Sequence, residues 1–359
     1  MIDYEQNILN FNKQLSFKNI KLVNAGTLSF DKLRTTLSEV EGLKKGGKSF
    51  GAAQDKPDGI IIAGMGGSAL AGDLVNFLAK DYELKIPVVV WKDYGLPRTN
   101  FKNPLFIAVS FSGNTEETTS AFRESRKYKL RAVVTSGGKL KELALKNNAA
   151  AALFSAGDLL PRQSLGLIFY GVAAIIRLKF PEFKIPEFSG LRPVDFKQKG
   201  RGLAVLLKGH AYRQAGRIPV VYSSVANKTI AYNWKIRFNE TAKLPSFYNV
   251  LPEMNHNEIV GFQNGIFSSK IFAIFLNDSN DNLRVKERFK ITEKLLKEKG
   301  VVCFDVILSG RGILEKFWKA IMMADWTAFY LARFAKINPA ATPIIDRIKK
   351  VMTKQTVNY

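Results

Sequence analysis

The fold class is indicated most clearly by the stretch Gly59-Ile-Ile-Ile-Ala-Gly-Met-Gly-Gly-Ser-Ala-Leu-Ala-Gly-Asp73. It opens with a short apolar run that is typical of a buried strand, and it continues into a helical pattern. The glycines between the two let the backbone turn tightly and bring its N–H groups close to a ligand. A strand that passes into a helix in this way is the repeating unit of parallel α/β proteins.

The same alternation recurs along the chain and predicts two α/β halves. A proline-containing stretch, residues 180–190, separates the two sets of strands. We therefore predict a parallel sheet flanked by helices in each of two domains, residues 1–190 and 191–359. The remaining strands are predicted at Val88–Trp91, Leu105–Val109, Leu130–Val134, Ile218–Tyr222, Lys270–Phe275 and Val301–Ile307, and helices at Leu165–Ile176, Glu315–Phe334 and Thr342–Met352. The glycine- and lysine-rich segment 41–57 is interpreted as a surface loop or a disordered insertion.

The composition is that of a globular protein with a basic surface. The 359 residues are 46% hydrophobic and carry a net charge of +23. The basic residues are spread along the chain without a long run or a nucleic-acid-reading motif, which argues against a nucleic-acid partner. The longest apolar stretch ends at Arg177, short of the ~20 residues that cross a bilayer. The lack of a secretory signal and a single cysteine, Cys303, lead us to expect a cytoplasmic protein, and we expect no membrane partner.

The turn at Gly64–Ala69 is a candidate phosphate site. A phosphate there would face the unpaired N–H groups at a helix N-terminus. A dinucleotide site or a turn without any ligand are the alternatives, and Ala69 stands where the dinucleotide pattern requires a third glycine.

A second candidate is Val109-Ser-Phe-Ser-Gly-Asn-Thr-Glu-Glu-Thr118, again between a strand and a helix. It offers the hydroxyls of Ser110, Ser112 and Thr115 within one turn, which suits a phosphate dianion without a metal. Capping of the helix by Ser112 or Asn114 is the alternative, but it explains only one or two of these residues.

Together, Gly-Met-Gly-Gly-Ser at 64–68 and Ser-Phe-Ser-Gly-Asn-Thr-Glu-Glu-Thr at 110–118 resemble the signature of the sugar isomerase (SIS) domain, a five-stranded parallel α/β fold that binds phosphosugars. The resemblance implies phosphate contacts from Gly67, Ser68, Ser110, Ser112 and Thr115.

Two segments of the second half, residues 237–245 (Arg-Phe-Asn-Glu-Thr-Ala-Lys-Leu-Pro) and 253–261 (Glu-Met-Asn-His-Asn-Glu-Ile-Val-Gly), resemble the bifunctional phosphoglucose/phosphomannose isomerases. That family has two SIS domains. The resemblance implies that Glu240 moves a proton between C1 and C2, and that His256 opens the sugar ring from the other subunit of a homodimer. A surface glutamate paired with Arg237 or Lys243 is the alternative for Glu240.

Two further elements carry the same resemblance. In Leu160-Pro-Arg-Gln163, Arg162 is expected to stabilise an enediolate. In Ala341-Thr-Pro-Ile-Ile-Asp-Arg-Ile-Lys349, Lys349 or the adjacent Lys350 is expected to assist ring opening, and Thr342 to admit both C2 epimers. The implied reaction is isomerisation of glucose 6-phosphate and mannose 6-phosphate to fructose 6-phosphate through a cis-enediol(ate), with no metal and no cofactor. Glycolysis, gluconeogenesis and sugar-nucleotide supply are all compatible with it.

Other functions are weighed against this one. Two histidines 46 positions apart and one cysteine provide no cluster for a zinc-dependent isomerase. An aminosugar phosphate synthase would need a nucleophilic cysteine, and Cys303 lies in a buried strand pattern. The remaining alternative is a phosphosugar-binding SIS regulator without turnover.

Overall fold

The computed structural model describes residues 2–28, 56–211 and 217–354. The chain divides into two compact units. The first unit is Asn10–Gly190, and the second is Leu191–Tyr359 together with Met1–Leu9. The segment predicted as an insertion lies, up to Asp55, outside the described residues.

The first unit is built on a largely parallel sheet, as the sequence predicts. Its strand order is β1-β6-β5-β4-β2-β3, and β1 pairs antiparallel with β6 while the other neighbours are parallel. The antiparallel edge strand was not expected. The strands are β1 (Lys21–Val23), β2 (Ile60–Gly64), β3 (Val88–Trp91), β4 (Leu105–Val109), β5 (Leu130–Thr135) and β6 (Ala150–Leu153).

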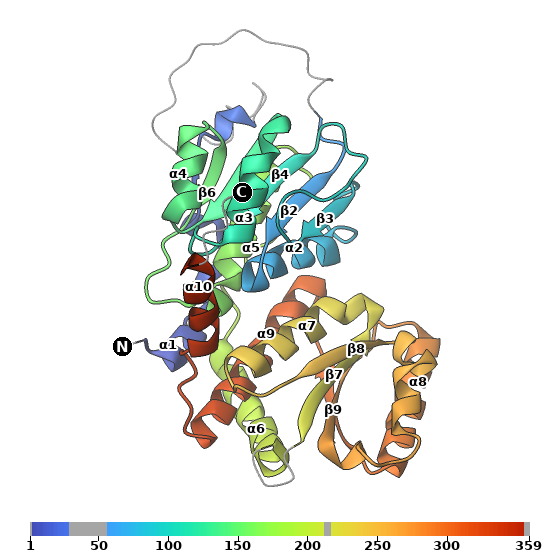
Figure 1. The fold of residues 1–359 in the computed structure, drawn as a ribbon. Helices are drawn as coiled ribbons and strands as arrows, with labels where there is room; N and C mark the ends of the chain where they lie inside the picture. Colours follow the sequence, from blue (N-terminus) through green and yellow to red (C-terminus); the bar gives the residue numbers. More distant parts are fainter. Residues whose placement is uncertain (1, 29–55, 212–216, 355–359) are drawn as a thin grey trace. The chain divides into compact units, whose positions relative to one another are not determined.

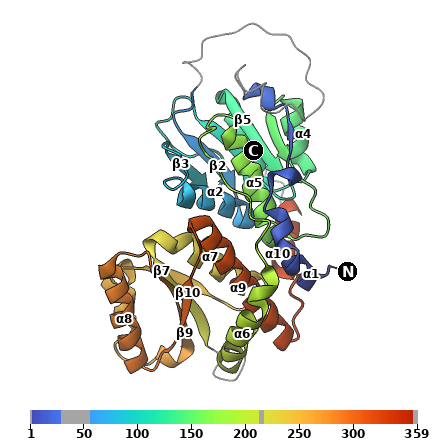
Figure 2. The same ribbon diagram turned by 180° about the vertical axis from the view of Figure 1, so that it is seen from behind.

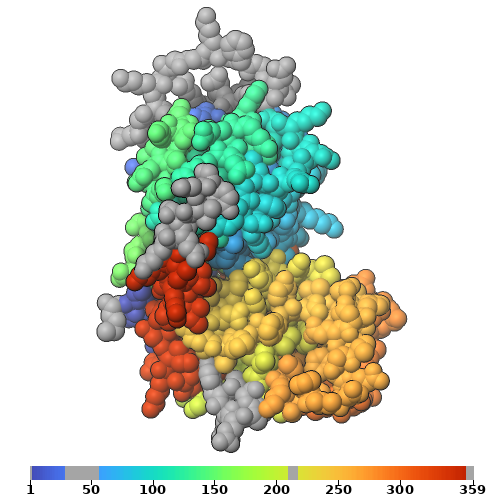
Figure 3. Space-filling view, in the orientation of Figure 1, coloured from blue at the N-terminus to red at the C-terminus, as the bar shows by residue number. Residues whose placement is uncertain are grey.

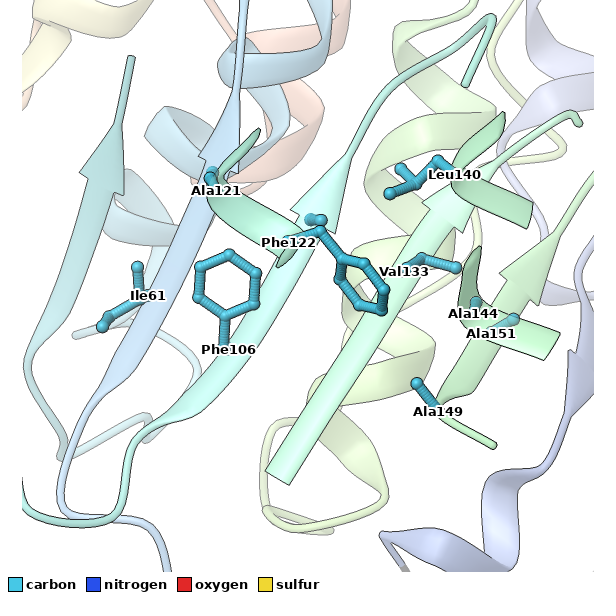
Figure 4. Packing of buried hydrophobic residues seen from close by; sticks show 11 residues of the cluster. Ile61, Phe106, Ala121, Phe122, Val133, Leu140, Ala144, Ala149 and Ala151 are labelled. Atoms are coloured by element: carbon cyan, nitrogen blue, oxygen red, sulfur yellow. The ribbon is translucent and has the colours of Figure 1, made fainter. Parts of the chain in front are cut away.

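Helices cover both faces of this sheet (Figures 1 and 2). Helices α2 (Gly66–Leu78) and α5 (Leu165–Arg177) pack together on one face, and α3 (Glu116–Glu124) and α4 (Gly138–Lys146) cover the other. Figure 4 shows strand residues Ile61, Phe106 and Val133 facing Phe122 and Leu140 of the covering helices. Because neither face meets water, the strands are apolar at nearly every position rather than at alternate ones.

The second unit holds four parallel strands in the order β10-β9-β7-β8. Helix α8 covers one face, and α6, α7 and α9 cover the other (Figures 1 and 2). The elements are α6 (Lys197–Ala211), β7 (Ile218–Ser224), α7 (Lys228–Glu240), β8 (Phe247–Leu251), β9 (Ile271–Asp278), α8 (Leu283–Glu298), β10 (Val302–Leu308), α9 (Ile313–Phe334) and α10 (Pro343–Lys354).

The first helix of the chain, α1 (Tyr4–Leu9), belongs to the second unit, although the sequence assigns it to the N-terminal half. Its Tyr4 ring stacks on Phe329 of α9 at 5.9 Å between centroids, and the Tyr4 hydroxyl shares a 2.7 Å hydrogen bond with Thr241 Oγ1. Contacts of this kind tie down a terminus that would otherwise fray. Among the described residues, none of the helices combines the length and the hydropathy needed to cross a bilayer.

Candidate active site

The first candidate phosphate motif lies at the start of α2, beyond the carboxyl end of β2. Gly67 and Ser68 occupy the first helical turn, and the N–H of Ser68 donates to the carbonyl of the N-cap residue Met65 at 3.0 Å. The Ser68 hydroxyl accepts a 3.1 Å hydrogen bond from the backbone N–H of Phe111. This bond joins the first motif to the loop after β4, so the two candidate segments lie side by side.

The second motif forms the loop from β4 to α3. The hydroxyls of Ser110 and Thr115 share a 2.9 Å hydrogen bond, and Ser110 Oγ also accepts from the N–H of Gly113 at 3.0 Å. Ser112 is exposed and accepts from the N–H of Asn114 at 3.3 Å. Thr115 is the residue before α3, and its side chain does not cap the helix. The Thr115 side chain therefore leaves the first N–H groups of α3 uncapped, and a helix N-terminus of this kind can accept an anion.

The start of α2 and the loop from β4 to α3 together form what we call the cradle. A third loop, which was not predicted from the sequence, supports it. It follows β5 with Ser136-Gly137-Gly138. Ser136 Oγ donates to the carbonyl of Phe111 at 2.6 Å, and the N–H of Lys139 donates to Asn114 Oδ1 at 3.1 Å. A Ser-Gly-Gly run directly after a predicted strand is the signal that would have indicated it.

Arg162 lies next to the same cradle. It is the middle residue of a 3₁₀ turn, Pro161–Gln163, and is 3% exposed. A Cβ added to Gly67 would lie 3.3 Å from the carbonyl oxygen of Pro161 and 3.6 Å from Arg162 Cα. The structure thus brings together, within the first unit, the predicted phosphate residues and the predicted arginine.

In the second unit, Glu240 and Thr342 line one cavity of about 550 Å³. Glu240 is the last residue of α7 and is half-buried. Lys243 has a left-handed backbone (φ 56°), and its Nζ donates to the carbonyl oxygens of Glu240 and, at 3.4 Å, of Pro339. These contacts hold the end of α7 against the segment that leads into α10. The other lining residues are Asn239, Lys243, Leu244, Pro245, Ile337, Asn338, Ala341, Pro343, Ile344 and Ile345.

A buried ion pair between α7 and α9 anchors the C-terminal end of α7. Arg237 Nε donates to Asp325 Oδ1 of α9 at 2.5 Å, and the Arg237 side chain is fully buried. Because Arg237 lies one turn before Glu240, this pair fixes the orientation of the helix end.

Thr342 precedes α10, and its carbonyl accepts from the N–H of Asp346 at 3.1 Å. Lys349 and Lys350 are both exposed on α10, which forms part of the surface in Figure 3 (red). Seven residues make almost two helical turns, so Lys349 lies on the same helix face as Thr342, and Lys350 lies ~100° away.

His256 is exposed and ends the 3₁₀ turn Glu253–His256, which follows β8. Helix α7 connects the parallel strands β7 and β8. Its last residue, Glu240, therefore lies toward the end of the sheet at which β8 begins. His256 lies beyond the opposite, carboxyl end of β8. The five residues of β8, each advancing roughly 3.3 Å, lie between the two ends. The second unit of one chain therefore does not bring Glu240 and His256 together.

Neither a metal cluster nor a reactive thiol is found among the residues that the structure describes. In the ranges 2–28, 56–211 and 217–354, no three His, Cys, Asp or Glu residues are grouped so that they could hold a metal ion. Burial, followed by the charge of Glu293, raises the pKa of the Cys303 thiol to about 12. The thiol is therefore protonated near neutral pH and is a poor nucleophile.

Known proteins resemble the chain over both halves. Residues 207–352 match the family described as the bacterial phospho-glucose isomerase C-terminal SIS domain. The chain is 33% identical over 298 residues to a bifunctional phosphoglucose/phosphomannose isomerase of Aquifex aeolicus, covering 82% of this chain and 91% of that protein. The protein of the same name from Thermoplasma acidophilum is 32% identical over 293 residues, covering 81% and 88%.

Solved structures agree on the fold. Tagatose-6-phosphate ketose/aldose isomerase from Escherichia coli matches with a TM-score of 0.61 at 17% identity, covering 94% of both chains. At that identity the match concerns the fold alone. The sequence identity with the Aquifex and Thermoplasma proteins over most of both chains goes further: the chain belongs to the bifunctional phosphoglucose/phosphomannose isomerase family.

Proposed function

We propose that this protein interconverts fructose 6-phosphate with glucose 6-phosphate and mannose 6-phosphate by metal-independent proton transfer. The observation that carries the proposal is the cavity of about 550 Å³ in which the half-buried Glu240 meets Thr342. A carboxylate in a cavity can act as a general base, and a hydroxyl beside it can shape the substrate's position. The family relatives support the choice of reaction.

The phosphate group is proposed to bind at the cradle of the first unit. Helix N-termini and hydroxyls satisfy a dianion there without a metal. The buried position of Arg162 beside Gly67 supports a role in stabilising the negative charge of the enediolate. The proposed phosphate contacts are Gly67, Ser68, Ser110, Ser112 and Thr115.

Glu240 is proposed to carry the proton of the isomerisation. It removes the proton from C2 of the open-chain aldose, and the C1 carbonyl oxygen takes up the negative charge of the enediolate. The proton of the C2 hydroxyl then passes to that oxygen, and Glu240 returns its proton to C1 to leave a ketone at C2. Thr342 in the same cavity supports dual specificity, because a small side chain leaves room for rotation about C2–C3. Both C2 epimers then present their proton to one base.

Ring opening is proposed to use His256 and Lys349. Lys349 is preferred over Lys350 because it shares a helix face with Thr342. The separation of His256 from Glu240 by the length of β8 supports a homodimer in which a second copy of the chain supplies the histidine. A single cysteine permits no disulfide within the chain, which fits the proposal of a cytoplasmic enzyme.

The test is to measure fructose 6-phosphate formation from each aldose phosphate in the presence of EDTA, comparing the native protein with Glu240→Gln. Turnover on both substrates that is lost in the variant is expected, since an amide cannot accept the proton. Glu287→Gln is the matched control, because Glu287 is exposed on α8 and pairs only on the surface with Arg284. Its rate should equal the native rate.

Two results would contradict the proposal. Tight binding of fructose 6-phosphate without turnover would identify a regulator. Loss of the native activity in EDTA, restored by a divalent metal, would show that the mechanism needs a metal.

A further inference from the structure

The carboxylate of Glu258, two residues after His256, is held by two strands at once. Tyr222 donates its hydroxyl to Glu258 Oε1 at 2.5 Å, and Asn249 Nδ2 donates to Oε2 at 2.6 Å. Tyr222 of β7 and Asn249 of β8 are register partners in the parallel sheet. Glu258 therefore bridges a cross-strand pair, and each of its oxygens has its own donor.

The donors are rigid. Tyr222 is 0% exposed, and its ring stacks on Phe275 with 5.2 Å between centroids. Burial, together with the charge of Glu258, raises the pKa of the Tyr222 hydroxyl. The tyrosine therefore keeps its proton and donates the hydrogen bond, and the glutamate accepts that bond. Hydrogen bonds to an ionised acceptor are the stronger kind.

The residues on either side of His256 are also fixed. Asn255 Nδ2 donates to Thr292 Oγ1 of α8 at 2.8 Å. Asn257 Nδ2 donates to Glu253 Oε1 at 2.7 Å, and its own Oδ1 accepts from the N–H of Glu258 at 2.6 Å. His256 itself is exposed. The loop is thus attached on both sides of a side chain that points to the outside.

We propose that Glu258, clamped by Tyr222 and Asn249, is a positioning residue that holds the loop of His256 in the geometry required for ring opening. The inference rests on the proposed function and deepens it. A histidine that acts on a ring bound by other parts of the protein must be held to within a fraction of an ångström, and a misplacement of about 1 Å costs up to ~100-fold in rate.

The experiment separates a ring-opening defect from a general one. Glu258→Ala removes both acceptors. It is made in the native protein and in a Glu240→Asp background, where the shortened carboxylate makes proton transfer the slow step. Interconversion of glucose 6-phosphate and fructose 6-phosphate is followed by NMR over hours, so that slow rates stay measurable, and melting temperatures report folding.

We expect Glu258→Ala to lower kcat by about 10- to 100-fold in the native background, with a smaller change in KM. In the Glu240→Asp background the same change should cost less than about 3-fold, because slowing a step that no longer limits the rate has little effect. Glu258→Gln should restore most of the activity, since Tyr222 can turn its hydroxyl to accept from the amide. Equal losses in both backgrounds, or no loss in the native one, would overturn the proposal.

Asp305→Asn is the matched control. Asn277 Nδ2 donates to Asp305 Oδ1 at 2.5 Å across β9 and β10, so the contact is of the same kind but does not touch the His256 loop. It should leave the native kcat unchanged. If Glu258→Ala fails to fold, Asn249→Ala replaces it, because it removes one donor from an edge strand. If the native protein turns over its substrates but Glu258→Ala does not lower kcat, only this inference is refuted. The proposed function then still stands.

Discussion

Replacement of Gly113 by alanine should disable the proposed phosphate-binding loop after β4. Gly113 has φ +71°, and a Cβ added there would lie 1.9 Å from the carbonyl oxygen of Gly137, where ordinary contacts begin at 3.4 Å. The carbonyl cannot easily move away, because it accepts a 2.8 Å hydrogen bond from Thr135 Oγ1. The loop that carries Ser110, Ser112 and Thr115 must therefore shift by more than 1 Å.

Two costs follow. The left-handed backbone costs alanine about 1–2 kcal/mol, which should lower the melting temperature by a few degrees. The displacement of the loop should weaken binding of fructose 6-phosphate by about 10- to 100-fold, since geometry at the 1 Å level is decisive in such sites. Titration calorimetry with fructose 6-phosphate and with inorganic phosphate measures both affinities.

Gly300→Ala is the control. Gly300 has φ +83°, but nothing lies within 4 Å of an added Cβ. It should therefore lower the melting temperature without changing either affinity. Native affinity in Gly113→Ala would refute the assignment of this loop to phosphate binding, and loss of affinity in both variants would show that backbone strain alone is responsible.

Further outcomes are expected for Asp278, Cys303 and Thr342. Asp278→Ala should lower stability by about 3–5 kcal/mol, because it leaves Lys316 buried without its carboxylate, and Asp278→Ala with Lys316→Met should recover much of that loss on thermal denaturation. Burial raises the pKa of Asp278, but hydrogen bonds from Lys316, the Asn280 N–H and Asn227 outweigh burial, so the pKa is lowered overall. The stabilisation by the ionised Asp278 is therefore present above about pH 4. It should fade as the pH falls further, which thermal denaturation at a series of acid pH values measures. Cys303 should react with a maleimide at pH 8 only after denaturation, and rapid native labelling would contradict its raised pKa. Thr342→Gln should depress turnover of mannose 6-phosphate selectively, whereas equal loss on both aldoses would count against a role in specificity.

Strands β1, β6 and β8 were not predicted from the sequence, and for β6 and β8 the reasons can be identified. Strand β6 reads Ala-Ala-Ala-Leu, and alanine favours helices. Its place between β1 and β5 overrides that preference through burial. Strand β8 carries Asn249 at its centre, and asparagine is depleted in strands. The same asparagine donates a hydrogen bond to Glu258. The residue that made the strand hard to predict is thus one that is proposed to hold the loop of His256.

The amino-acid sequence was enough to predict the α/β class, two α/β halves and the two candidate phosphate motifs at strand ends. Each of these depends on local order: apolar runs, glycines at strand ends and hydroxyls within one turn. Which distant residues lie together became known from the three-dimensional structure. Arg162 lies beside Gly67, Thr342 and Glu240 line the same cavity, and Glu258 lies between Tyr222 and Asn249. Such contacts depend on strand order and register, which arise from packing of the whole chain and leave no periodic signal in the sequence.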